Sequence, residues 1–180
     1  TRPLSIAIIG CGPAGQAAAI LLARQGHCVN LFEQSPHLGP VGAGILLQPI
    51  GLAVLDELGA LPRVLALGDP VHRLHGCTDR GRVVLSIAYA DLHPALCGIG
   101  VHRGMLFETL QAVVAATPAR LHPGRRMIAF DGDLDAAPCL IDDHDRREGP
   151  FDLVIVADGA RSALRDQLGI TARVARYPWG

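Results

Sequence analysis

The chain has 180 residues, of which 49% are hydrophobic, and its formal net charge is −1. A chain of this length can bury one sizeable core, and its balanced charge argues against nucleic acid as a partner. Its apolar stretches fall short of the roughly 18 residues that a membrane span needs, and no basic, cleavable leader precedes the first strand-like run. We therefore expect no membrane insertion and a cytoplasmic location.

Cysteine and histidine offer no obvious metal or disulfide framework. The five cysteines are odd in number and lack the Cys-x-x-Cys spacing of zinc sites, so we expect free thiols. The eight histidines are scattered, and His72 and His75 are separated by an odd interval, which places them on opposite faces of a strand. We predict no metal site.

Alternating apolar runs and helical patterns predict an α/β fold, a Rossmann-like domain built on a parallel sheet. We expect strands at 4–9, 28–32 and 99–101, with weaker candidates at 127–130 and 139–141, and helices at 13–25, 51–58 and 103–115. The run 151–157 is apolar on both faces, which predicts a central strand of the sheet.

The most informative local pattern is Gly10-Cys11-Gly12-Pro13-Ala14-Gly15, between the first strand and the first helix. The first glycine permits a tight turn, the second lets backbone approach a pyrophosphate, and the third allows close helix–strand packing. Pro13 fits an early helical position, and Ala14 follows it at the helix start, where unpaired N–H groups attract an anion. Alone, the pattern is also compatible with an ordinary strand-to-helix turn.

An acid follows at the distance that a dinucleotide site requires. Glu33 ends the second strand about twenty residues later, where its carboxylate can accept hydrogen bonds from both ribose hydroxyls. Gln34, the next residue, is a further candidate for cofactor binding. An acid here would repel a 2′-phosphate. The sequence thus predicts FAD or NAD, and not NADP, at this turn.

Three further segments carry recognisable patterns. The glycine-rich stretch 41–49 contains Gly44 and Ile45, and Arg103 opens the helix at 103–115 in an Arg-x-x-Leu-x-x-x-Leu pattern. A cation at a helix N-terminus opposes the macrodipole unless an anion lies nearby, although a surface ion pair with Glu33 or Glu108 would serve equally well. The run 157–165, Ala-Asp-Gly-Ala-Arg-Ser-Ala-Leu-Arg, follows the last predicted strand.

These segments together resemble the flavoprotein aromatic hydroxylases, single-component FAD monooxygenases similar to para-hydroxybenzoate and salicylate hydroxylase. The resemblance covers essentially the whole chain and places Gly44 and Ile45 beside the flavin ring. It brings Arg103 to the pyrophosphate, and it gives Asp158, Gly159 and Arg161 to FAD and the nicotinamide donor. Ile50 departs from the family, in which an Asn often follows the proline.

The resemblance implies bound FAD, NADH or NADPH as electron donor, and dioxygen with a small aromatic or heteroaromatic molecule as substrates. It singles out no catalytic residue, and it leaves the oligomeric state open, with a homodimer among the arrangements it allows. A non-catalytic FAD-binding module, one part of a split flavoprotein, and another FAD- or NAD-dependent oxidoreductase remain alternatives.

The same resemblance suggests how the chain is divided. We expect a discontinuous FAD-binding domain at 1–70 and 98–170, interrupted at 71–97 by an antiparallel hairpin that extends towards a substrate domain. The segment 171–180 opens a new strand-like pattern, which we interpret as the start of a truncated substrate domain. The chain is then the amino-terminal part of a longer enzyme.

Overall fold

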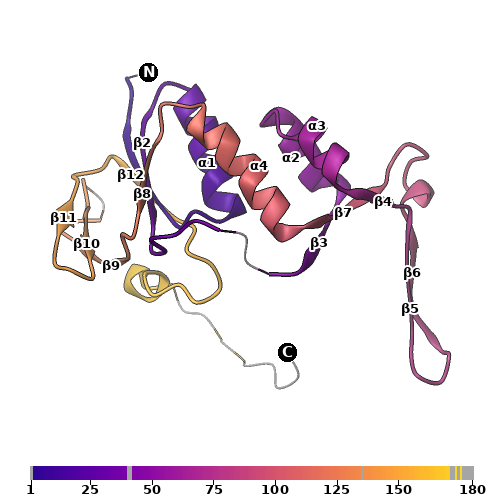
Figure 1. Cartoon of the computed structure of the whole chain (residues 1–180). Coiled ribbons are helices and arrows are strands. Elements are labelled where there is room, and N and C mark those ends of the chain that lie inside the picture. The colour runs from indigo at the N-terminus through magenta and orange to yellow at the C-terminus, as the bar shows by residue number, and fades with distance from the viewer. Residues whose placement is uncertain (1, 40–41, 135, 171–172, 174, 176–180) are drawn as a thin grey trace. The chain divides into compact units, whose positions relative to one another are not determined.

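The computed structural model describes residues 2–39, 42–134, 136–170, 173 and 175 (Figure 1). It divides into two compact units, one formed by 1–38 with 118–180 and the other by 39–117. We refer to them as unit 1 and unit 2. The expected strand at 171–180 lies almost entirely outside the described residues.

Unit 1 contains a parallel sheet and one long helix, followed by a smaller antiparallel sheet. In chain order its elements are β1 (Ser5–Ile9), α1 (Pro13–Arg24), β2 (Cys28–Glu33), β8 (Arg120–Pro123), β9 (Met127–Asp131), β10 (Cys139–Asp142), β11 (Arg147–Glu148), β12 (Leu153–Val156) and a 3-10 helix, η2 (Arg165–Leu168). The described strands of the parallel sheet run in the order β12-β1-β2-β8. The expected α/β class with a parallel sheet is confirmed.

The prediction of a central position for 151–157 is wrong. β12 pairs only with β1 and lies at the edge of the described sheet, and Leu153 is 40% exposed. The strand that is buried on both faces is β1, where Ile6, Ala7 and Ile8 are all fully buried. β12 is apolar for another reason: Val154 belongs to a cluster that packs between the two sheets of this unit. An apolar run therefore does not by itself show that a strand has neighbours on both sides within its sheet.

That cluster joins the parallel sheet to the small sheet β11-β10-β9. Its buried members come from distant parts of the chain: Ala7, Ile9, Phe32, Met127, Leu140, Phe151 and Leu164. Gln167 of η2 adds a backbone clamp, because its side-chain amide donates to the Ile128 carbonyl (2.6 Å) and accepts from the Phe130 amide (3.1 Å). The segment after β12 is therefore fixed on unit 1.

Unit 2 contains helices around a three-stranded antiparallel sheet in the order β3-β7-β4. In chain order its elements are β3 (Gly44–Leu47), α2 (Pro49–Glu57), α3 (Leu61–Leu67), β4 (Asp69–Val71), β5 (Arg73–Cys77), β6 (Val83–Ala88), a 3-10 helix, η1 (Tyr89–Asp91), β7 (Gly98–His102) and α4 (Arg103–Ala115). The expected helix at 103–115 is confirmed residue for residue. Among the described residues, no helix is long and apolar enough to cross a membrane.

The expected antiparallel hairpin is present as β5 and β6, which pair from Arg73↔Ala88 to Cys77↔Val83. Figure 1 shows it as a long ribbon that projects beyond the helices and the three-stranded sheet of unit 2. Its apolar side chains are largely exposed: Val84, for example, is 64% exposed and Ile87 47%. The described part of the chain leaves this hairpin without a covering layer.

Candidate functional site

The glycine turn between β1 and α1 has two glycines that the fold itself requires. Gly10 has φ +101°, and a Cβ at this position would lie 2.5 Å from the Ala157 carbonyl oxygen. A Cβ on Gly15 would lie 1.9 Å from the Gly10 carbonyl oxygen. Neither position can hold a larger residue without moving backbone, because both neighbours are main-chain atoms. The first and third glycines therefore fix the packing of the turn and of α1.

Gly12 is different, because nothing in the described structure lies within 4 Å of where its Cβ would be. It is the N-cap of α1 and offers no side-chain cap, and the first turn, which begins with exposed Pro13 and Ala14, contains no acid. The unpaired N–H groups at this helix start thus face open space. This geometry suits a pyrophosphate, which would accept these hydrogen bonds and meet the positive end of the helix dipole.

Glu33 lies against this turn. Its Oε2 accepts a hydrogen bond from the Cys11 amide (2.8 Å), and its Oε1 accepts one from the Ser35 amide (2.9 Å). These two bonds orient the carboxylate and leave further lone pairs for ribose hydroxyls. Gln34 follows and is exposed. The carboxylate also acts on the buried Cys11 thiol, whose pKa is raised to about 11, first by burial and then by the charge of Glu33.

Asp158 and Gly159 follow β12, next to the glycine turn. The Ala157 amide donates to the Ile9 carbonyl (2.8 Å), and Asp158 Cα would lie 2.9 Å from a Cβ on Gly10. Gly159 has φ +87°, which an L side chain rarely adopts. The structure thus brings together the turn, Glu33 and the Asp-Gly pair, although they are far apart in sequence.

The residues directly after Gly159 do not form a regular helix. The chain turns through 160–164, and the 3-10 helix starts only at Arg165. The buried Ser162 accepts a hydrogen bond from the Arg165 amide through Oγ (3.1 Å) and so caps this start. Arg161 is exposed.

In unit 2, Arg103 is the first residue of α4. His102 caps the helix, since its Nδ1 accepts a hydrogen bond from the Gly104 amide (3.1 Å). The Arg103 side chain lies against Gly42, where a Cβ would be 2.9 Å from Nη1. Arg103 forms no ion pair with Glu108, the acid on its own helix. Arg103 is exposed, so its side chain is accessible to an anion.

Gly44 and Ile45 form the start of β3, a strand that the sequence did not predict. They pair with the end of β7, Gly44 with His102 and Ile45 with Val101. This pairing places them directly beside the residue that opens α4. Within unit 2 the structure therefore groups Gly44, Ile45 and Arg103 at one end of the small sheet.

Sequence reasoning missed Gln16, a polar residue in the first half of α1. It is fully buried, and its Nε2 donates to the Cys11 carbonyl (2.9 Å), which stabilises the turn from inside. Its Oε1 has no hydrogen-bond partner among the described residues. The available signal was a lone amide in an otherwise Ala- and Leu-rich helix.

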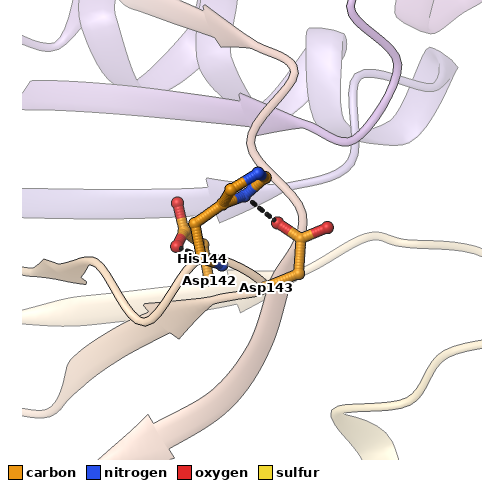
Figure 2. Close-up of side chains that lie close together, drawn as sticks. All are labelled: Asp142, Asp143 and His144. Carbon is orange, nitrogen blue, oxygen red and sulfur yellow. Dashed lines mark hydrogen bonds and ion pairs between the residues drawn. The ribbon is translucent and has the colours of Figure 1, made fainter.

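One group of possible metal ligands occurs at the end of β10, where Asp142, Asp143 and His144 lie close together (Figure 2). The Asp142 carboxylate is already saturated. Its Oδ2 accepts from the guanidinium groups of Arg125 (2.6 Å) and Arg146 (2.7 Å), and its Oδ1 accepts from the amides of His144 and Arg146. This carboxylate organises the loop between β10 and β11.

Comparison with known proteins places these features in a family. The family model described as FAD binding domain matches residues 4–180. The chain is 31% identical to the FAD-dependent monooxygenase atnJ of Arthrinium sp., over 99% of this chain and 41% of that protein. It is 31% identical to 6-hydroxynicotinate 3-monooxygenase of Bordetella bronchiseptica, over 96% of this chain and 45% of that protein.

Solved structures show the same fold. The tetrameric form of 2-methyl-3-hydroxypyridine-5-carboxylic acid oxygenase is 27% identical, with a TM-score of 0.80, over 95% of this chain and 43% of that chain. PqsL of Pseudomonas aeruginosa, in complex with 2-aminobenzoylacetate, is 26% identical with a TM-score of 0.79, over 98% of this chain and 49% of that chain. The chain thus spans less than half the length of these relatives. It belongs to the FAD-binding domain family of the flavoprotein aromatic hydroxylases.

Proposed function

We propose that the protein carrying this chain is a monooxygenase that uses NADH or NADPH and dioxygen to hydroxylate a small aromatic or heteroaromatic molecule. The observation that carries the proposal is the junction of Gly10 with the Ala157–Asp158 peptide beside Glu33. It combines an open helix start, an oriented acid and the Asp-Gly pair in one place. A plain dinucleotide turn requires only the first two.

The residues present fit FAD, and each has a distinct task. The N–H groups after Gly12 would bind the pyrophosphate, and Glu33 would accept hydrogen bonds from the adenosine ribose. Arg103 would supply a cation to the pyrophosphate, and Asp158 with Gly159 would serve FAD and the nicotinamide donor. When bound, FAD supplies the redox chemistry, taking electrons from the nicotinamide and passing them to dioxygen.

The protein's own contribution is to orient the flavin and exclude water. Gly44 begins the edge strand β3 and carries no side chain, which suits the close approach of a planar ring, and Ile45 beside it would offer that ring an apolar side chain. The apolar side chains of β5 and β6, exposed in the described chain, would cover the site once packed against a substrate domain. We accordingly propose 1–70 with 98–170 as the FAD-binding domain and 71–97 as the excursion to that second domain.

The decisive experiment uses the full-length protein with a panel of phenolic and heteroaromatic acids. We expect substrate-dependent oxidation of NADH or NADPH together with an oxygenated product identified by mass spectrometry. Stimulated oxidation without any oxygenated product would refute the monooxygenase and leave FAD binding intact. A purified protein without visible flavin absorbance would instead favour an NAD-dependent dehydrogenase.

A non-catalytic FAD-binding module is the rival from another class. It predicts a yellow protein whose flavin is not reduced by either nicotinamide under anaerobic conditions, with or without aromatic compounds. The two proposals therefore separate on reduction of the bound flavin, which is followed directly by its absorbance.

A further inference from the structure

The three-stranded sheet of unit 2 has one covered face and one open face. Side chains of directly paired residues point to the same face. The face that carries Leu47, Ile99 and Val101 is buried, with 9%, 3% and 5% exposure. The opposite face carries the alternate residues of the same strands. This second face lines most of an open, shallow cavity of about 550 Å³, to which Ile45, Val101, Leu67 and Leu74 also contribute.

The register defines the middle of that cavity. Gly100 of β7 pairs with Leu46 of β3 on one side and with Asp69 of β4 on the other. Gly98 precedes it and His102 follows it along the same face of β7. Gly100 therefore lies between two residues that carry side chains, Leu46 and Asp69, and forms the floor of the cavity between them.

Neither the backbone nor the neighbours require a glycine at this position. The φ angle of Gly100 lies outside the left-handed region, and its Cβ would be 3.7 Å from Val71 Cγ2 and 3.8 Å from the Asp69 carbonyl oxygen, ordinary van der Waals distances. Gly98 on the same face is a clear contrast, because its Cβ would be 2.9 Å from the Tyr89 hydroxyl. A glycine weakens a strand by roughly 0.5–1 kcal/mol relative to alanine. A strand glycine without a packing reason often marks a site that a ligand or another backbone approaches closely.

The walls of this cavity are apolar, with two polar groups. Leu46 and Val71 flank the floor. Asp69 lies directly beside Gly100 on β4, and His102 lies two residues along β7, so the two are diagonal neighbours about 7–8 Å apart at this register. That separation spans a six-membered ring. The cavity is within the range of small-molecule sites, in which a few polar groups on apolar walls orient the ligand.

Both polar groups have definite hydrogen-bonding characters. Because His102 Nδ1 accepts from the Gly104 amide, the proton of the neutral ring is on Nε2, which can donate. Asp69 is exposed and has no ion pair with any described residue. Its carboxylate attracts a donor or a cation and repels another carboxylate.

We propose that this cavity binds the ring of the aromatic substrate over Gly100 and that Asp69 determines its specificity. The ligand class is an aromatic or heteroaromatic ring with an N–H, O–H or cationic group at the edge that faces Asp69, and with no carboxylate there. An acceptor at the edge that points along β7 would face His102. This inference rests on the proposed function, since it assigns a substrate to the same enzyme.

The test uses the full-length, FAD-loaded protein and substrate titrations followed by perturbation of the flavin spectrum. The probes are matched pairs of rings, such as an aminophenol against the corresponding hydroxybenzoate. The wild type should bind the amino compound more tightly. Asp69→Asn should lose about tenfold or more of that preference, the size of one charge-assisted hydrogen bond.

Steric variants test the position independently. Gly100→Val fills the floor and should weaken ring binding by about tenfold or more with unchanged FAD content and melting temperature, and Gly100→Ala should have a smaller effect in the same direction. Gly51→Ala, at a helix position with nothing within 4 Å of the new Cβ, is the matched control and should leave ring binding unchanged. If Gly100→Val does not fold, ring binding by Gly100→Ala and Asp69→Asn still tests the cavity assignment.

The results separate this inference from the proposed function. Hydroxylation that is insensitive to Gly100→Val and Asp69→Asn overturns the cavity assignment and leaves the monooxygenase in place. Ring binding that responds to both variants, in a protein that never yields an oxygenated product, supports the cavity and refutes the monooxygenase.

Discussion

The main-chain amide of Arg125 donates a hydrogen bond to the carbonyl of Glu33, at 2.8 Å. The Arg125 guanidinium is in turn held by Asp142, through Nε at 2.6 Å, and by Glu148, through Nη2 at 2.9 Å. The end of β2, which carries Glu33, is thus anchored to the small sheet of unit 1. A buried carboxylate outside the candidate site therefore controls the position of Glu33.

Replacing Asp142 should destabilise the protein strongly. Its side chain is fully buried and accepts hydrogen bonds from the Arg125 and Arg146 guanidinium groups and from two backbone amides. In Asp142→Asn an amide nitrogen replaces one accepting oxygen and leaves buried donors without an acceptor, so the free energy of unfolding should fall by about 3 kcal/mol. Asp131→Asn breaks an ion pair of the same small sheet with exposed Arg147 and should cost less than about 1 kcal/mol. Urea unfolding measures both, and equal losses would contradict the assignment.

The same carboxylate predicts a dependence on acid. Burial alone would raise the pKa of Asp142, but hydrogen bonds from the amides of Arg146 and His144 and from two guanidinium groups hold it well below the usual range. A depressed folded-state pKa contributes stability above the unfolded value of about 4 and loses it as pH falls towards the folded value. Stability should therefore fall less steeply below pH ~4 in Asp142→Asn than in the wild type. If stability fell equally steeply with pH in both proteins, Asp142 would not be the cause of the acid sensitivity.

Cys11 should be an unreactive thiol despite its place in the candidate site. Its pKa of about 11, against an ordinary 9.0, lowers the thiolate fraction roughly a hundredfold, and burial adds a steric barrier. We expect alkylation at pH 8 to label the exposed Cys28 and Cys77 first, as mapped by mass spectrometry. Glu33→Gln removes a charge that raises this pKa and should accelerate labelling of Cys11. Rapid labelling in the wild type would contradict the burial.

Local patterns predicted the parts of the site that depend on backbone geometry. The glycine turn, Glu33 at the end of β2 and the start of α4 at Arg103 are each specified by neighbours in the chain, and all lie where expected. Long-range partners were beyond sequence reasoning: nothing near Asp142 indicates that it fixes Arg125, or that Gln167 binds the β9 backbone.

Helix α3 was missed for a related reason. Its N-cap, Ala60, offers no capping side chain, and the helix has only 7 residues, so the polar start signal and a long helical period are both absent, although Pro62 lies in the first turn, where proline is tolerated. The central position predicted for β12 was wrong because Val154 and Val156 are apolar for another reason: they pack against a cluster that includes the distant Leu164.

Arg103→Ala should separate stability from cofactor binding. A cation in the first helical turn opposes the macrodipole, so its loss should leave the apoprotein unchanged or more stable by up to about 1 kcal/mol. FAD affinity should fall by about tenfold or more, the value of a charge-assisted hydrogen bond to a phosphate. Arg63→Ala, in the first turn of α3, is the matched control and should not alter FAD affinity. Flavin fluorescence titration and thermal melting give the two readouts.

Gly10→Ala and Gly12→Ala should fail in opposite ways. At Gly10 the new Cβ would meet the Ala157 carbonyl at 2.5 Å with φ +101°, so the apoprotein should lose about 2 kcal/mol or more of stability. At Gly12 the backbone has φ −71° and ψ 178°, which alanine adopts freely, and the Cβ has no neighbour within 4 Å. Gly12→Ala should therefore melt at or above the wild-type temperature and yet lose FAD affinity, because the methyl group fills the space where a pyrophosphate would approach the helix start. If Gly12→Ala kept the wild-type FAD affinity, measured by flavin fluorescence titration, the pyrophosphate would not bind at this turn.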